Sequence, residues 1–133
     1  MLTIQREQTA QGHAICRPVG ELDAFTVSQF RQALADLAKG SQIIIDLSGI
    51  PFMDSAGLGA LIGGIRRIRE LGGDVAVACN RPTLLRLLYS TGFDRIVTLA
   101  PTATEAANAL RDLEPERPNP PIMVDRVDDD RTV

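Results

Sequence analysis

The sequence has 133 residues, of which 44% are hydrophobic and 23% are charged, and its formal net charge is −3. These values are typical of one soluble globular domain that can bury a core, and no apolar run is long enough to span a bilayer. The first fifteen residues lack the basic segment and apolar stretch of a signal peptide, so we expect a cytoplasmic protein that does not bind membranes.

The acidic charge is concentrated at the C-terminal end. Residues 114–133 hold six acidic residues, three arginines and four prolines, and their one short apolar run is at 122–124. Residues 1–113 therefore hold eleven of the 17 acidic residues and eleven of the 14 basic residues, so their charges balance. A domain without excess positive charge is not expected to present a basic surface that binds nucleic acid phosphates. We therefore expect a folded domain over 1–113, a flexible acidic, proline-containing tail over 114–133, and no direct binding to nucleic acid.

Two strands and a helix are predicted in the first third of the chain. Residues 2–7 and 13–20 have strand-like composition, and the two strands should pair antiparallel because the turn-like TAQG between them is short. Residues 25–38 place four apolar residues at helical spacing, and Gly40 follows as a stop signal. These four residues are Val27, Phe30, Leu34 and Leu37.

The middle of the chain predicts a strand, a helix and a second strand. Residues 42–47, QIIIDL, form an apolar run of the kind that is buried on both faces of a parallel sheet. Residues 56–71 place six apolar side chains on one side of a helix that Gly72 and Gly73 end. These side chains are Leu58, Leu61, Ile62, Ile65, Ile68 and Leu71. Residues 74–79, DVAVAC, predict the second strand.

The alternation continues to the end of the predicted domain. Pro82 suits the first position of a helix that carries four leucines and ends at Gly92. Residues 95–99 predict a last strand, and residues 102–113 predict a last helix. We therefore expect an α/β fold with a mostly parallel sheet, an antiparallel N-terminal strand and about four covering helices.

The two cysteines, Cys16 and Cys79, share no close spacing and have no neighbouring histidine. Both belong to apolar strand-like runs, where a small buried thiol is the simplest interpretation. Neither a zinc site nor a disulfide framework is indicated.

The stretch MDSAGLG at 53–59 lies where a strand ends and a helix begins. Ser55 is therefore predicted to be the N-cap of the helix, with its hydroxyl accepting from amides of the first turn. The same position suits a phosphoserine, because uncompensated amides and the helix dipole favour negative charge there. Asp54 would repel the added charge, so phosphorylation would create a negative protrusion better suited to repelling a partner than to ordering the domain.

Small residues gather on one face of the second predicted helix. This face lies opposite the leucines and isoleucines and consists of Ala56, Gly59, Ala60, Gly63 and Gly64. A glycine inside a helix costs about 1 kcal/mol relative to alanine, so several of them require a reason, and close approach of another backbone is one. The approaching backbone could belong to the same domain or to an external protein.

No catalytic residue, cofactor or metal is expected. The serine motif lacks the first glycine of G-x-S-x-G, and the single histidine, His13, belongs to the N-terminal turn, so a serine hydrolase would have no base. There is no Walker lysine for a nucleotide either. Asp23, Asp46 and Asp54 could approach one edge of the sheet, but acids near strand ends are commonly solvated or act as caps.

Four stretches of the sequence together carry a family resemblance. They are GELDAFTV at 20–27, IIIDLSGIPFMDSAGLGAL at 43–61, GGDVAVAC at 72–79 and TGFDRIV at 91–97. They resemble the STAS domain, and among its branches the bacterial anti-sigma factor antagonists. The resemblance implies a small STAS-type α/β domain whose serine is phosphorylated by an anti-sigma factor that is itself an ATP-dependent serine kinase. It also implies that the unphosphorylated form binds this kinase and frees a sigma factor, and that a metal-dependent serine phosphatase resets the switch.

The resemblance extends to individual residues. Ser55 matches the phosphoacceptor, and it is the single hydroxyl in the motif because Ala56 stands where many relatives carry a second Ser or Thr. The expected partner-binding residues, which include the acidic loop before the first helix and the small-residue face, are Asp23, Asp54, Ala56, Gly57, Leu58, Gly59, Ala60 and Gly63. The alternative function is a STAS scaffold or ligand-sensing module in another signalling complex.

Overall fold

The computed structural model describes residues 1–9, 12–37 and 42–113. Five strands form one sheet in the order β1-β2-β3-β4-β5. β1 pairs antiparallel with β2, and each later strand pairs parallel with the strand before it. The strands are β1 (Leu2–Gln8), β2 (Ala14–Gly20), β3 (Gln42–Asp46), β4 (Asp74–Ala78) and β5 (Thr98–Ala100). The predicted mostly parallel sheet with an antiparallel N-terminal strand is confirmed.

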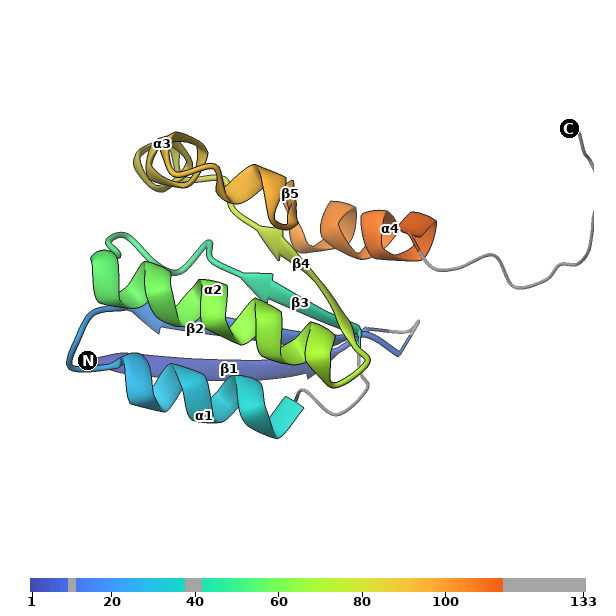
Figure 1. The fold of residues 1–133 in the computed structure, drawn as a ribbon, viewed down its shortest axis with the longest axis horizontal. Helices are drawn as coiled ribbons and strands as arrows, with labels where there is room; N and C mark the ends of the chain where they lie inside the picture. The colour runs from blue at the N-terminus through green and yellow to red at the C-terminus, as the bar shows by residue number, and fades with distance from the viewer. Residues whose placement is uncertain (10–11, 38–41, 114–133) are drawn as a thin grey trace, which may run out of the picture.

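Four α-helices and one short 3₁₀ helix connect and cover the strands. They are α1 (Val27–Leu37), α2 (Ser55–Glu70), α3 (Pro82–Ser90), η1 (Phe93–Arg95) and α4 (Ala103–Leu113). Figure 1 shows α1 and α2 side by side along one face of the sheet, and α4 packs on the opposite face against β3, β4 and β5. The α/β fold class and the four covering helices are therefore also confirmed.

The side chains of β3 explain why the sheet is covered on both faces. Ile43 and Ile45 belong to the larger core cluster under α1, α2 and α3, and Ile44 belongs to a smaller, alanine-rich cluster under α4. All three are fully buried. Successive strand residues point to opposite faces, so a continuous apolar run requires cover on both sides.

Two predicted starts are wrong by two residues or more, and the other predicted starts lie within one residue of the observed ones. The first helix starts at Val27 and not at Phe25, because the Asp23 carboxylate accepts from the N–H groups of Phe25 and Thr26 and holds these residues in a turn. The last strand starts at Thr98, because η1 follows Gly92 and buries Phe93 completely. Local hydrogen bonds and one buried aromatic ring override the strand-like composition of residues 95–97.

Both cysteines are buried free thiols, as predicted. Burial raises the pKa of Cys16 to about 11, and burial likewise raises the pKa of Cys79. Because the thiolate is the reactive form, both side chains act as packing groups at neutral pH.

Gly40 and the predicted tail at 114–133 lie outside the described residues, so the domain boundary stays a prediction. Within the described part of the chain, no helix has the length and apolar character needed to cross a membrane.

Candidate functional site

The loops that follow β2 and β3 meet at the carboxyl edge of the sheet, the usual working edge of parallel sheets. Leu22 and Met53 form an isolated parallel bridge between the two loops. The Leu22 N–H donates to the Phe52 carbonyl at 3.3 Å, and the Asp54 N–H donates to the Leu22 carbonyl at 3.3 Å. These bonds bring Asp23 and Asp54, which are 31 positions apart in the chain, into adjoining loops.

Asp54, and not Ser55, is the N-cap of α2, which corrects the predicted cap. Its backbone is extended, and its Oδ1 accepts from the Gly57 N–H at 2.9 Å. Its Oδ2 accepts a longer bond of 3.4 Å from the Ala24 N–H in the neighbouring loop. Asp and Ser are comparably good caps, and here the aspartate also ties the two loops together.

Ser55 is the first residue of α2 and its side chain is exposed. Among the described residues, its hydroxyl has no hydrogen-bond partner, and neither Asp54 nor Asp23 forms an ion pair. A group added to this hydroxyl would therefore stand in solvent next to the Asp54 carboxylate, which no basic side chain in the described part of the chain neutralises.

Asp23 is half-buried and organises its own loop. Its carboxylate accepts from the N–H groups of Phe25 and Thr26. The Thr26 hydroxyl in turn accepts from the Asp23 N–H at 3.0 Å and donates to the Glu21 carbonyl at 2.8 Å. The predicted acidic loop is thus held by its own hydrogen bonds and lies beside the start of α2.

The small residues of α2 divide into two groups. Gly57 and Ala60 are buried against the domain itself, and a methyl group on Gly57 would collide with the Leu22 carbonyl oxygen. Gly59 and Gly63 are exposed, and a methyl group on either would meet nothing within 4 Å. Ala60 therefore belongs to the core and not to a face opposite it, and the free surface of the helix runs along Ser55, Gly59 and Gly63.

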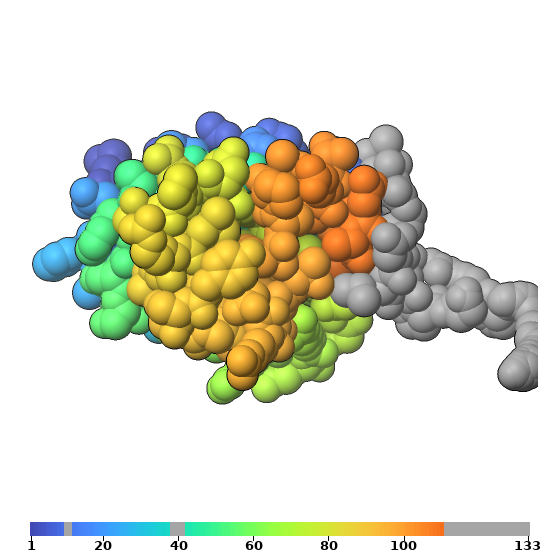
Figure 2. All heavy atoms as spheres, turned by 90° about the horizontal axis from the view of Figure 1, so that it is seen from above, coloured from blue at the N-terminus to red at the C-terminus, as the bar shows by residue number. Residues whose placement is uncertain are grey.

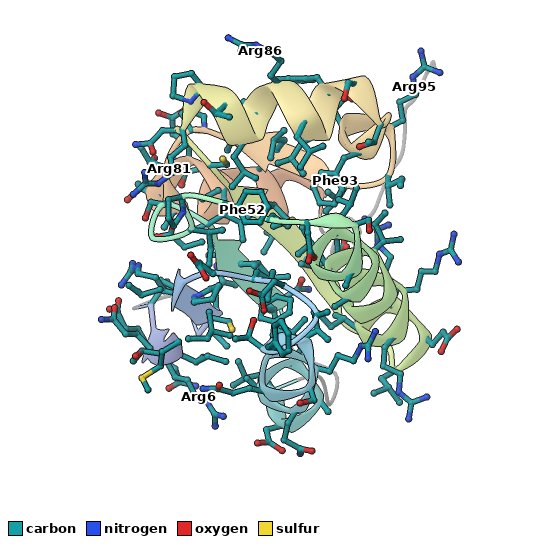
Figure 3. All side chains as sticks on the ribbon, turned by 90° about the vertical axis from the view of Figure 1, so that its left-hand side faces the viewer. Arg6, Phe52, Arg81, Arg86, Phe93 and Arg95 are labelled. Carbon is teal, nitrogen blue, oxygen red and sulfur yellow. The ribbon has the colours of Figure 1, made fainter. Side chains whose placement is uncertain are left out.

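Two exposed aromatic rings flank the site and were missed by the sequence reasoning. Phe25 is 93% exposed in the Asp23 loop, and Phe52 is 55% exposed in the loop that leads into α2. Figure 3 shows Phe52 between that loop and α3. Single exposed apolar side chains are common, but a ring on each of two loops that pair with each other makes this edge a candidate contact surface. The available signal was that two of the five aromatic residues fall in the two loops around the serine motif.

A hollow of about 220 Å³ lies beside Phe52. It is lined by Pro51, Phe52, Met53, Thr83, Leu84 and Leu87. The hollow lies between α3 and the segment that leads into α2, and this segment ends two residues before Ser55, so the hollow and Ser55 lie on the same edge. Figure 2 shows α3 in the foreground of the view from above, with the start of α2 beside it. The edge thus combines a hydroxyl, carboxylates and apolar surface, which suits binding of a protein.

Asp46 does not join Asp23 and Asp54. It is 6% exposed on the α4 face of the sheet, where Arg17 Nε donates to it at 2.9 Å and the Ser48 N–H at 3.0 Å. Burial opposes its charge, but the bonds from Ser48 and Arg17 outweigh burial and hold the pKa of the Asp46 carboxyl below its ordinary value.

Within the described residues, no group of three or more His, Cys, Asp or Glu side chains could hold a metal ion.

Replacing Asp46 by Asn is expected to lower the free energy of unfolding at neutral pH by about 2 kcal/mol, because the charge-assisted bond from Arg17 is lost. The pKa of Asp46 is lower in the folded than in the unfolded state, so its contribution is complete above about pH 4 and is lost as the pH falls further. Urea unfolding of both proteins at pH 7 and near pH 3 measures this, and a difference that stays constant with pH contradicts it.

The chain is similar to known proteins over most of the described residues. The model of the family described as "STAS domain" matches residues 5–106. An anti-sigma F factor antagonist of Paenibacillus polymyxa is 35% identical over 107 residues, which cover 78% of this chain and 89% of the relative. The crystal structure of an anti-sigma factor antagonist from Mycobacterium paratuberculosis matches with a TM-score of 0.73 and 29% identity, covering 84% of this chain and 96% of that one. The phosphorylated form of SpoIIAA, a Bacillus cell fate determinant, matches with a TM-score of 0.61 and 27% identity, covering 82% and 100%.

Proposed function

The chain belongs to the STAS domain family, and we propose that it is an anti-sigma factor antagonist that phosphorylation of Ser55 switches off. The unphosphorylated form binds an anti-sigma factor that is also a serine kinase, and this binding releases a sigma factor. A metal-dependent serine phosphatase restores the binding form. The protein itself is a regulatory binding module and not an enzyme.

The state of Ser55 is the observation that carries this proposal. An exposed hydroxyl without a partner among the described residues, on the first residue of a helix whose cap is already made by Asp54, can be modified without breaking any bond of the fold. The phosphoryl group would remain at the positive end of α2, where the helix dipole favours it. The site is thus accessible to a kinase in the folded protein.

The relatives support the same reading. The solved structures of SpoIIAA include an unphosphorylated and a phosphorylated form, and the matching curated relatives carry the names of anti-sigma F or anti-sigma-B factor antagonists. Their names supply the anti-sigma factor as the partner class, and the serine motif of this chain supplies the point of modification. Cytoplasmic localisation follows from this role, because a sigma factor acts on the transcription machinery.

The partner surface that we propose is the carboxyl edge around Ser55. Asp23 and Asp54 present negative charge, Leu58 is partly buried at the first turn of α2, and the rings of Phe25 and Phe52 project from the two loops. Exposed apolar rings beside fixed polar groups are typical of protein interfaces. The buried Gly57 and Ala60 act by shaping this surface, and Ala56, Gly59 and Gly63 extend it along the helix.

Incubation with the cognate anti-sigma kinase and ATP is expected to add one phosphate to the protein, at Ser55. Mass spectrometry of the digested product gives the position, and Ser55→Ala should take up no phosphate. Ser48→Ala is the matched control and should be phosphorylated like the wild type. Phosphate on Ser48, Ser90 or Thr91 with Ser55 unmodified would reject the assignment.

A further inference from the structure

A groove of about 270 Å³ separates α1 and α2 on the surface of the domain. It is lined by Arg31, Leu34, Ala35, Gly63, Gly64 and Arg67. Two glycines create it. Gly64 leaves room for the Leu34 side chain of α1, because a methyl group there would collide with Leu34 Cδ1. Gly63 leaves the space above open, because a methyl group there would meet nothing within 4 Å.

The groove continues the surface that carries the phosphoacceptor. Ser55, Gly59 and Gly63 are four residues apart along α2, so they form one line on the helix. At a rise of about 1.5 Å per residue, Gly63 lies about 12 Å from Ser55 along the helix axis. A partner that covers Ser55 and extends along this bare line reaches the groove without leaving the helix.

The mouth of the groove is positively charged. Both Arg31 and Arg67 are exposed, and Arg31 has no ion-pair partner within the described part of the chain. Arg67 lies 4.0 Å from Glu70 in an exposed pair of the kind that contributes little. An apolar floor below two weakly compensated guanidinium groups fits an aliphatic side chain next to a carboxylate.

We propose that the groove between α1 and α2 is a second contact point for the anti-sigma factor, which places there a segment with an aliphatic side chain beside an aspartate or glutamate. This inference rests on the proposed function. It divides the interface into an acidic, phosphorylatable end at Ser55 and a basic end at Arg31 and Arg67. A partner with the opposite arrangement of charge can bind in one orientation only.

Two full-length variants test the groove. Gly63→Leu fills it, and the double variant Arg31→Glu/Arg67→Glu reverses the charge at its mouth. Each should weaken binding of the unphosphorylated protein to the anti-sigma factor at least tenfold in titration calorimetry. Gly63→Leu should unfold at the wild-type temperature or slightly above it, because the added side chain starts in open space and leucine is a better helix former than glycine. The arginine variant should unfold close to the wild-type temperature, because both side chains are exposed. If Gly63→Leu fails to fold, the arginine variant still decides.

The matched control is Arg86→Glu/Arg95→Glu, an equal charge reversal. These two arginines project away from the body of the protein on α3 and η1 (Figure 3), so binding should change less than twofold. If the wild type does not bind the anti-sigma factor at all, the proposed function fails. If it binds and the groove variants bind equally well, the groove proposal alone is overturned.

Two other occupants are distinguished by measurements on the free protein. If residues 122–124 of this chain fill the groove, their NMR signals will shift in Gly63→Leu. If a second copy fills it, sedimentation will show a wild-type dimer that Gly63→Leu converts to a monomer. Either result would overturn the assignment to the anti-sigma factor, whereas a monomer with unchanged signals at 122–124 supports it.

Discussion

Replacing Gly57 by alanine is expected to lower the free energy of unfolding by about 3 kcal/mol. The added methyl group would collide with the Leu22 carbonyl oxygen and lie 2.8 Å from Met53 Cγ. Leu22 and Met53 form the bridge that joins the two loops of the site, so the collision cannot be relieved without separating them. Denaturant unfolding of the two proteins measures the difference.

Gly59→Ala is the matched control, because it makes the same change one half-turn along the same helix. A methyl group on Gly59 meets nothing within 4 Å, and alanine is the better helix former, so this variant should be more stable than the wild type by up to about 1 kcal/mol. Equal stability of the two variants would mean that α2 does not pack directly on the Leu22 backbone.

Phosphorylation of Ser55 is expected to weaken the complex with the anti-sigma factor at least tenfold. The phosphoryl group adds about 1.5 to 2 negative charges beside Asp54, whose carboxylate already takes the Gly57 amide as its partner. Burying such charge against an interface without a counter-charge costs about 2–5 kcal/mol, and each 1.4 kcal/mol or so is a factor of ten in affinity. Titration calorimetry of both forms measures the change.

Ser55→Asp should be a poor mimic of the phosphorylated protein. It adds one charge and lacks the third oxygen, and at the first position of α2 its short side chain lies closer to the helix than a phosphoryl group does. We expect its affinity to fall between those of the two natural forms. If the Ser55→Asp variant binds as weakly as the phosphorylated protein, this expectation is wrong, and a single added negative charge at position 55 is enough to weaken binding fully.

Most of the fold could be predicted because the local patterns and the tertiary structure agree. The run Ile43–Ile45 needs cover on both faces and obtains it. Of the six apolar residues predicted for one side of the second helix, five are buried or partly buried against the core, whereas Leu71 is exposed at the end of α2. Pro82 begins α3, and Gly92 adopts a left-handed φ of 77° just beyond its end. Each of these signals lies in adjacent residues or on one face of one helix or strand. The residue pattern of a single element is therefore enough to detect it.

The errors arise where contacts between distant segments decide the structure. Asp and Ser are both good N-cap residues, so the local sequence does not decide between Asp54 and Ser55. In the structure Asp54 accepts from the Gly57 N–H of α2 and also from the Ala24 N–H of the other loop, a contact between distant segments. Ala60 looked like part of a small-residue face, but the approach of the sheet and α1 makes it core. The groove beside Gly63 depends on how closely α1 packs, which no pattern within α2 can reveal.

The central claim is that one phosphoryl group on Ser55 separates a binding form from a non-binding form. The most direct test is titration calorimetry of the unmodified protein and the protein fully phosphorylated at Ser55 against the same purified anti-sigma factor, at one salt concentration and with nucleotide held constant. Ser55→Ala, treated with kinase and ATP, controls for the treatment itself and should bind like the unmodified protein. We expect the dissociation constant of the phosphorylated form to be at least tenfold higher than that of the unmodified form. Equal dissociation constants for the two forms would contradict the switch.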